Sequence, residues 1–185
     1  MRTQANFVIA VIIACGLLSG RGLGAYGGGA GTPEDPYLIG TPEHMNQIGL
    51  HPQDWDKHFR LVADIDLSAY TGSQFNLIGV DRVAQDPNEP LAVPFSGVFD
   101  GQRHIIANFR YEVAGDEDPS DGWVRGIGLF RLIDGAEARI EDLILLDPNL
   151  RPSPTCVERV GRIGALAGVV NSGLIIGCRV EGGRN

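Results

Sequence analysis

The chain has 185 residues, 26 of them Gly and 11 Pro, and a formal net charge of −8. The acidic balance argues against nucleic acid and anionic membrane surfaces as partners, because both select clustered Lys and Arg. The high Gly content without a Gly-x-y period excludes collagen and favours a turn-rich, mainly β fold.

Residues 1–25 are predicted to be a secretory signal peptide. The basic residue Arg2 precedes an apolar run over residues 7–18, and small residues follow it. As a helix this run would span about 18 Å, less than a hydrocarbon core of about 30 Å, so we predict no membrane span. We place cleavage near Ala25; the alternative is a lipoprotein with Cys15 as the lipidated residue.

The first part of the exported chain is predicted to hold a leader, a helix and a strand. Residues 26–32 are expected to form a flexible, Gly-rich leader without a role in the core. A short helix that covers the N-terminal end of the fold is predicted over residues 41–50, because Thr41 is a hydroxyl N-cap and Pro42 occupies the first helical position. Strict alternation of apolar and polar residues over 59–67 predicts a half-buried strand.

Three later segments, residues 106–111, 140–145 and 175–180, share one pattern. Each has large apolar residues at its first and sixth positions, and the first positions are 34 and then 35 residues apart. A Gly-x-Phe/Leu tripeptide precedes each segment, at residues 97–99, 128–130 and 164–166. A period of this length indicates stacked units. The third position has a residue type that tolerates the left-handed backbone of a bulge or corner: Asn108, Asp142 and Gly177.

Stacked in register, the strands of these units would form parallel sheets. Residues 33–185 are therefore predicted to be an all-β solenoid, with a sandwich or a barrel as the alternative. Cys156 and Cys178 are either paired in a disulfide, or Cys178 is a buried free thiol. Three polar or Pro-rich loops separate the units and are expected to form a variable surface, at residues 81–94, 112–125 and 147–159.

The order of these motifs resembles bacterial secreted GLUG-motif proteins. Residues 31–39, a short helix, residues 59–67 and residues 95–109 are similar to the opening of such proteins, and residues 160–183 resemble a GLUG repeat. The resemblance implies a right-handed parallel β-helix of the pectate-lyase-like type, in exported proteins, surface adhesins and some immunoglobulin A peptidases, where the repeats are accessory. Arg131 departs from the family pattern, which more often has Gly at this position.

One acid pair is a candidate for catalysis or for Ca²⁺ binding. Asp64 and Asp66 lie two apart on one strand, so their carboxylates point the same way and could act as an acid/base pair or hold the cation. A solvated strand face is the simpler interpretation.

Two further sets of residues are weaker candidates. Asp116, Asp118 and Asp121 suggest a Ca²⁺ loop, but the Glu that an EF-hand needs is missing and a solvated acidic loop explains them as well. Sugars could stack on three aromatic side chains if these are exposed: Trp55, Tyr70 and Trp123. For the two tryptophans, a cap and a loop anchor are the simpler roles.

These observations favour a secreted or surface-exposed, non-catalytic β-helix module for adhesion or for binding a glycan or protein. One alternative is a carbohydrate-active lyase or hydrolase that uses Asp64 and Asp66. Another is an N-terminal fragment of a larger secreted protein. In that case further repeats or another chain would cover the apolar end of the last coil, close to Asn185. No cofactor is predicted beyond the Ca²⁺ option.

Overall fold

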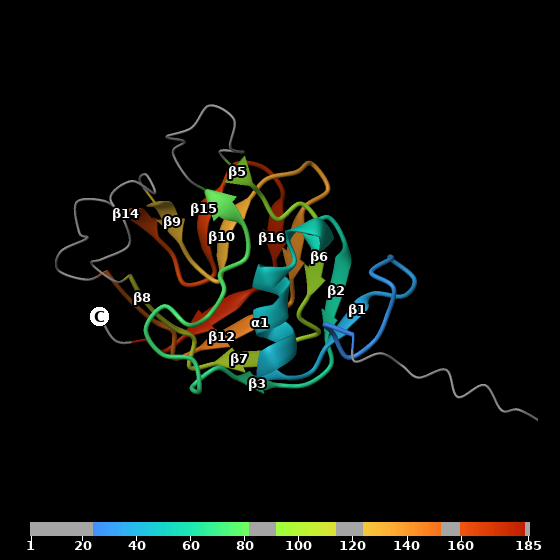
Figure 1. Cartoon of the computed structure of the whole chain (residues 1–185), viewed down its shortest axis with the longest axis horizontal. Coiled ribbons are helices and arrows are strands. Elements are labelled where there is room, and N and C mark those ends of the chain that lie inside the picture. The colour runs from blue at the N-terminus through green and yellow to red at the C-terminus, as the bar shows by residue number, and fades with distance from the viewer. Residues whose placement is uncertain (1–23, 82–91, 114–123, 153–159, 184–185) are drawn as a thin grey trace, which may run out of the picture.

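The computed structural model describes residues 24–81, 92–113, 124–152 and 160–183. These residues form short β-strands in mostly parallel sheets, with one α-helix and one 3₁₀ turn, and none of the described sheets closes into a barrel (Figure 1). Several residues singled out above lie outside the described ranges: residues 1–23, Asp116, Asp118, Asp121, Trp123 and Cys156.

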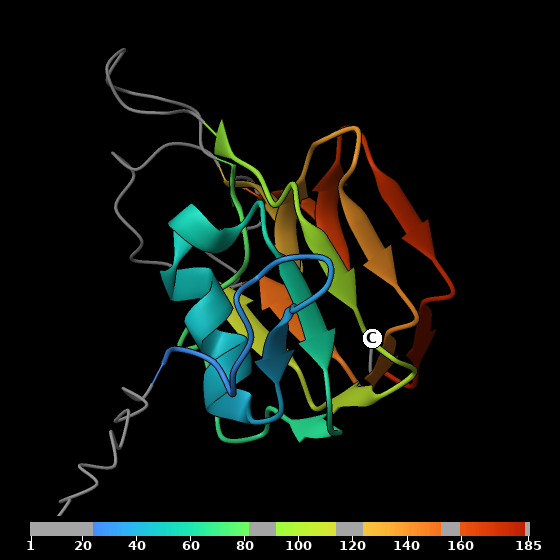
Figure 2. The same cartoon turned by 90° about the vertical axis from the view of Figure 1, so that its right-hand side faces the viewer.

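The predicted helix is confirmed as α1 (Pro42–Leu50). Thr41 caps it: the Thr41 hydroxyl oxygen accepts a hydrogen bond from the His44 amide at 3.2 Å. Met45 and Ile48 bury the inner face of the helix, and the 3₁₀ turn η1 (Pro52–Asp54) follows. In Figure 2, α1 lies at one end of the stack of strands and the red strands of the C-terminal units lie at the other end.

The segment before α1 belongs to the fold, so the expectation of a leader without a core role is wrong for its first residue. Tyr26 is buried, its ring packs against Phe59 with centroids 5.6 Å apart, and its hydroxyl donates to Asp54 Oδ2 at 3.0 Å. Gly27 and Gly28 exchange backbone hydrogen bonds with Leu38. The aromatic ring supplies enough apolar surface to hold a Gly-rich segment in place.

Two parallel sheets carry most of the stack. The first has the strand order β1-β2-β6-β11-β16, and the second has the order β3-β7-β12-β17. The first is formed by β1 (Tyr37–Ile39), β2 (His58–Leu61), β6 (Val98–Asp100), β11 (Arg139–Glu141) and β16 (Leu174–Ile176). The second is formed by β3 (Ile65–Asp66), β7 (Ile105–Ala107), β12 (Ile144–Leu146) and β17 (Arg179–Glu181).

Three parallel strand pairs and one antiparallel pair complete the described sheets. The parallel pairs are β8 (Arg110–Val113) with β13 (Asn149–Pro152), β9 (Val124–Ile127) with β14 (Val160–Ile163), and β10 (Phe130–Ile133) with β15 (Ala167–Val170). The antiparallel pair is β4 (Val80–Asp81) with β5 (Ala92–Val93).

The alternation predicted over residues 59–67 is present but divides between two strands. Phe59, Leu61, Ile65 and Leu67 are all buried. The chain leaves β2 after Leu61 and enters β3 at Ile65, in the other large sheet. The alternation of buried and exposed side chains therefore continues from one sheet into the other.

The alignment of the repeats is partly wrong. Ile140 pairs with Ile175, 35 residues later, as predicted, but the residue that pairs with Ile140 from the preceding unit is Phe99, not Ile106. Ile106 instead pairs with Leu145. Each unit turns two similar corners, after β6 and after β7 in the first complete unit, so one short pattern occurs at two different places in the coil.

The prediction of left-handed backbone at the third position is confirmed. Asn108, Asp142 and Gly177 have φ values of 58°, 48° and 65°. Asp142 and Gly177 occupy equivalent places after β11 and β16, whereas Asn108 follows β7 and corresponds to two other residues with positive φ, Asp147 and Gly182.

Replacing Ile140 with Asp should unfold the protein. Ile140 is fully buried, and a carboxylate there would have no partner, at a cost of more than about 4 kcal/mol in the free energy of unfolding. Ile175→Asp is the matched control, because Ile175 has the same place in the next unit but is 38% exposed. Urea denaturation followed by circular dichroism measures both; a stable Ile140→Asp variant would contradict this core.

Candidate functional site

A polar platform lies on the outer side of the β8–β13 pair. The two strands run parallel with Arg110 opposite Asn149 and Glu112 opposite Arg151. Between these positions Tyr111 is buried and Leu150 packs against the core. Because successive side chains of a strand point to opposite faces, the four polar side chains all point outward.

Two adjoining hollows are centred on this platform. One of about 400 Å³ is lined by Asn108, Arg110, Asp147, Asn149, Arg151 and Gly183. The other, of about 210 Å³, shares three of these residues (Arg110, Asn149 and Arg151) and adds Thr71, Gly72, Tyr111 and Glu112. We call the two together the Arg110–Arg151 groove. It is polar, and the β8–β13 pair supplies the three residues that the two hollows share.

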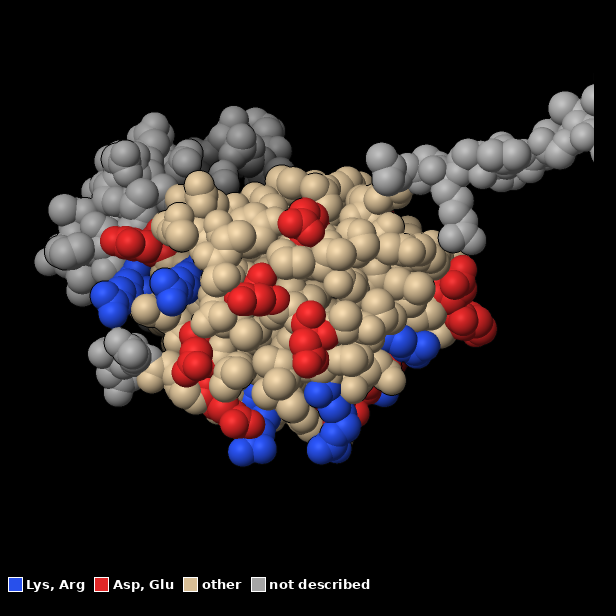
Figure 3. All heavy atoms as spheres, turned by 90° about the horizontal axis from the view of Figure 1, so that it is seen from below, with Lys and Arg blue, Asp and Glu red and all other residues tan. Residues whose placement is uncertain are grey.

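The groove combines hydrogen-bond donors with acceptors. Arg151 Nε donates to Asn149 Oδ1 at 3.0 Å, which orients both side chains along the strand pair. Asp147 lines one hollow and Glu112 lines the other, and Arg110 and Arg151 line both. Figure 3, seen from the side of β3 and β7, shows acidic and basic side chains interspersed over that part of the surface. This mixture suits a ligand rich in hydroxyl groups better than a densely charged polymer.

Asp66 lies at the border of the groove. Its Oδ1 accepts hydrogen bonds from Asn108 Nδ2 and from the Ser68 amide, both at 2.9 Å. These hydrogen bonds, the one from Asn108 first, hold the pKa of Asp66 below its ordinary value, and the positive charge of Arg110 acts in the same direction. Asp66 thereby fixes the orientation of Asn108, a lining residue.

Asp64 engages different partners. Its Oδ1 accepts a hydrogen bond from the Ile105 amide at 2.9 Å, and His104 Nδ1 lies 3.0 Å away. The Ile105 amide is the main cause of a lowered pKa at Asp64, and His104 adds to it. A general acid needs a raised pKa, whereas the pKa values of Asp64 and Asp66 are lowered. Their surroundings therefore favour ionised side chains that accept hydrogen bonds from the neighbouring strand. The catalytic role of this pair stays a prediction.

Among the described residues, no group of three or more His, Cys, Asp or Glu side chains is placed to hold a metal ion, and the Asp64–Asp66 pair belongs to no such group.

Of the two aromatic candidates that the structure describes, Trp55 is a core residue and Tyr70 packs against the core. Trp55 is 2% exposed, and its Nε1 donates to the Ile48 carbonyl at 2.7 Å, so no ring face is open to a sugar. Trp55 instead holds η1 against α1. Tyr70 is half-buried, with its ring edge-on to Phe75 at a centroid distance of 5.6 Å. Burial raises the pKa of the Tyr70 phenol.

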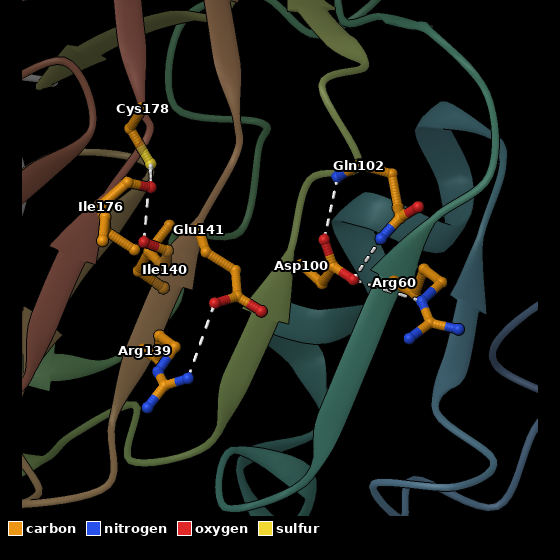
Figure 4. A network of polar contacts seen from close by, with 8 residues as sticks. All are labelled: Arg60, Asp100, Gln102, Arg139, Ile140, Glu141, Ile176 and Cys178. Carbon is orange, nitrogen blue, oxygen red and sulfur yellow. Dashed lines mark hydrogen bonds and ion pairs between the residues drawn. The ribbon is translucent and has the colours of Figure 1, made fainter.

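Cys178 is half-buried beside the first large sheet (Figure 4). Its Sγ lies 3.5 Å from the carbonyl oxygens of Ile140 and Ile176. Burial raises the pKa of the thiol, which makes it a poor nucleophile at neutral pH. Its predicted partner Cys156 lies outside the described residues, so the disulfide stays untested.

Sequence reasoning missed the groove. Arg110 and Arg151 come from strands that pair at an offset of 39 residues. Arg110 lies in the repeated segment 106–111, but the pattern defines no residue type at its position, and Arg151 lies in no motif. The available signal was the polar alternation of Arg110 with Glu112 and of Asn149 with Arg151. It becomes informative only when the register between the two strands is known.

Comparison with known proteins gives two relatives and a solved structure. No protein-family model matches the chain. Halomucin of Haloquadratum walsbyi is 29% identical over 170 residues, and a "Putative Gly-rich membrane protein" of Evansella cellulosilytica is 31% identical over 156 residues. These matches cover 89% and 84% of this chain but only 2% and 16% of the relatives' own lengths.

The solved structure shares the fold. The crystal structure of a "putative immunoglobulin A1 protease" from Bacteroides ovatus superposes with a TM-score of 0.53 at 17% identity, over 85% of this chain and 41% of that one. Within the described part of the chain, no helix is long and apolar enough to cross a membrane.

The carboxylates of Asp64 and Asp66 should make stability depend on pH. Their pKa values in the folded protein lie below the ordinary value of 3.8, so their stabilising effect is present above about pH 4 and is lost as the pH falls through the lowered values. The Asp64→Asn/Asp66→Asn variant should therefore lose less stability on acidification than the wild type.

Denaturant unfolding at a series of pH values measures this difference. Asp56→Asn is the control, because the Asp56 side chain is similarly exposed but pairs with its neighbour Lys57. Parallel acid profiles for the wild type and the double variant would contradict the assignment.

Proposed function

We propose that the chain is a right-handed parallel β-helix related to GLUG-motif proteins, and that it works as a secreted or surface-exposed, non-catalytic binding module. The parallel register of successive units, with steps of 41 and then 35 residues from Phe99 to Ile140 to Ile175, supports the helix. The shared fold with a protein named for an immunoglobulin A1 protease agrees with the family that the motifs resemble.

The ligand that we propose is a glycan, and the Arg110–Arg151 groove carries this proposal. Sugar hydroxyls both donate and accept hydrogen bonds, and the groove offers guanidinium and amide donors beside the carboxylates of Asp147 and Glu112. Its paired strands give a floor that needs little ordering on binding.

The glycan is expected to be neutral or sparsely charged and to bind weakly. The net charge of −8 disfavours a dense polyanion. Neither Trp55 nor Tyr70 offers a platform at this groove, so affinity comes mainly from hydrogen bonds, each of which contributes about 1 kcal/mol. Weak single sites suit adhesion through many copies.

Removing either groove arginine should reduce glycan binding. A glycan array identifies a neutral ligand, and isothermal titration calorimetry then compares Arg110→Ala and Arg151→Ala with the wild type; each is expected to lose about tenfold in affinity. Arg139→Ala is the matched control, since Arg139 is an exposed arginine on the first large sheet, paired with Glu141. Binding that favours heparin, or an Arg139→Ala loss equal to the others, would overturn the proposal.

Export is proposed to end with cleavage after Ala25. The burial of Tyr26 supports this boundary, because a cut at that position leaves the first core residue in place. Mass spectrometry of the chain secreted from a bacterial host should give Tyr26 as the N-terminal residue, and Cys15→Ser should leave that mass unchanged. A lipid-modified Cys15 at the N-terminus would contradict cleavage at this position.

A further inference from the structure

The two arginines of the Arg110–Arg151 groove place their charges in the same hollows. In the register of the β8–β13 pair, Arg110 lies opposite Asn149 and Arg151 lies opposite Glu112. Arg151 Nε donates to Asn149 Oδ1 at 3.0 Å, so this side chain turns along its own strand toward the row that contains Arg110. Both arginines line both hollows. Two positive charges therefore occupy the centre of the groove.

This pair of charges is not neutralised by a described carboxylate. Within the part of the chain that the structure describes, neither Arg110 nor Arg151 forms an ion pair, although Glu112 and Asp147 line the hollows beside them. Three arginines of the two large sheets, by contrast, each pair with a carboxylate: Arg60, Arg139 and Arg179. The two groove arginines thus keep their charges available to a ligand.

The centre of the groove has the chemistry of a carboxylate site. Two guanidinium groups that share a hollow repel one another, and an anion bound between them offsets that repulsion. Each guanidinium presents its N–H donors as a planar fork that matches the two oxygens of a carboxylate. Asn149 lies between the arginines, and its Oδ1 is engaged by Arg151, so its amide nitrogen is left to donate to the same group.

The acids of the groove limit how many charges a ligand can have. Asp147 lines one hollow and Glu112 lines the other, on either side of the three residues that the hollows share. A carboxylate at the centre is attracted by the arginines. A second carboxylate on the neighbouring sugar would lie beside Asp147 or Glu112 and would be repelled. The groove therefore favours single carboxylates that are separated by neutral sugars.

We propose that the centre of the Arg110–Arg151 groove is a subsite for one carboxylate-bearing sugar, a hexuronic or a sialic acid, with uncharged sugars on both sides of it. This inference rests on the glycan-binding function proposed above and specifies its ligand. The hydroxyl groups of the neutral sugars contact the polar side chains at the two ends of the groove. The carboxylate adds charge-assisted hydrogen bonds from the arginines.

Matched pairs of oligosaccharides test the subsite. Isothermal titration calorimetry compares a hyaluronan tetrasaccharide, in which every second sugar is a uronic acid, with its carboxyl methyl ester, and compares 3′-sialyllactose with its methyl ester. At least one free acid should bind about tenfold more tightly than its ester, and that pair identifies the class of acid. Arg110→Ala should remove the difference. Arg139→Ala is the control and should retain it, because Arg139 pairs with Glu141 on the first large sheet.

A second set of variants tests the limit on charge. Glu112→Gln combined with Asp147→Asn should raise severalfold the affinity for tetragalacturonate, which has a carboxylate on every sugar. Asn tolerates the left-handed backbone of Asp147, whose φ is 51°. Asp100→Asn combined with Glu141→Gln is the matched control, because it removes the same net charge on the first large sheet and should leave this affinity unchanged.

Three results would overturn the carboxylate subsite: equal binding of acid and ester in both pairs, tighter binding of lactose 3′-sulfate than of either acid, or no gain for tetragalacturonate in the double variant. The glycan-binding function would survive any of them if the esters still lose affinity in Arg110→Ala. If neither the acids nor the esters bind and a glycan array stays empty, the function itself is overturned together with the subsite.

Discussion

The stack depends on one kind of backbone hydrogen bond that is repeated at five corners of the two large sheets. At each corner the amide of the turning residue donates to the carbonyl just before the equivalent residue of the next unit, as in Asp142 to Ile176 at 3.0 Å and Asp147 to Glu181 at 2.8 Å. The parallel ladder therefore continues around the bend, where a sheet would otherwise leave polar groups unpaired. The same bond recurs in Gly101 to Glu141, Asn108 to Leu146 and Leu67 to Ala107.

This bond determines which residues fit the corners. A left-handed backbone turns the chain while its amide still points along the stack, and Asp and Asn tolerate that conformation through their short polar side chains. The next unit needs Gly: a Cβ at Gly177 would clash with the Asp142 carboxylate, and one at Gly182 with the Asp147 carboxylate. An Asp at the corner of one unit thus requires Gly at the same corner of the next unit, and this pair occurs after β11 and β16 and again after β12 and β17.

The sequence predicted features that depend on adjacent residues, and it did not predict those that depend on contacts between distant parts of the chain. The N-cap of α1 and the left-handed corners depend on a few adjacent residues, and both were predicted. The pairing of Phe99 with Ile140 depends on the length of the chain between them, and two similar corners in each unit led to the wrong alignment. The outward placement of Arg110 and Arg151 follows from that tertiary arrangement, so no local pattern predicted it.

The groove lies beside the last described strand of the second large sheet. Gly183 follows β17 and lines the groove. A polymeric glycan that repeats one epitope would engage many copies of the protein at once, and each further contact would form at high effective concentration. Weak hydrogen-bonded contacts of about 1 kcal/mol each would then suffice for adhesion without an aromatic platform.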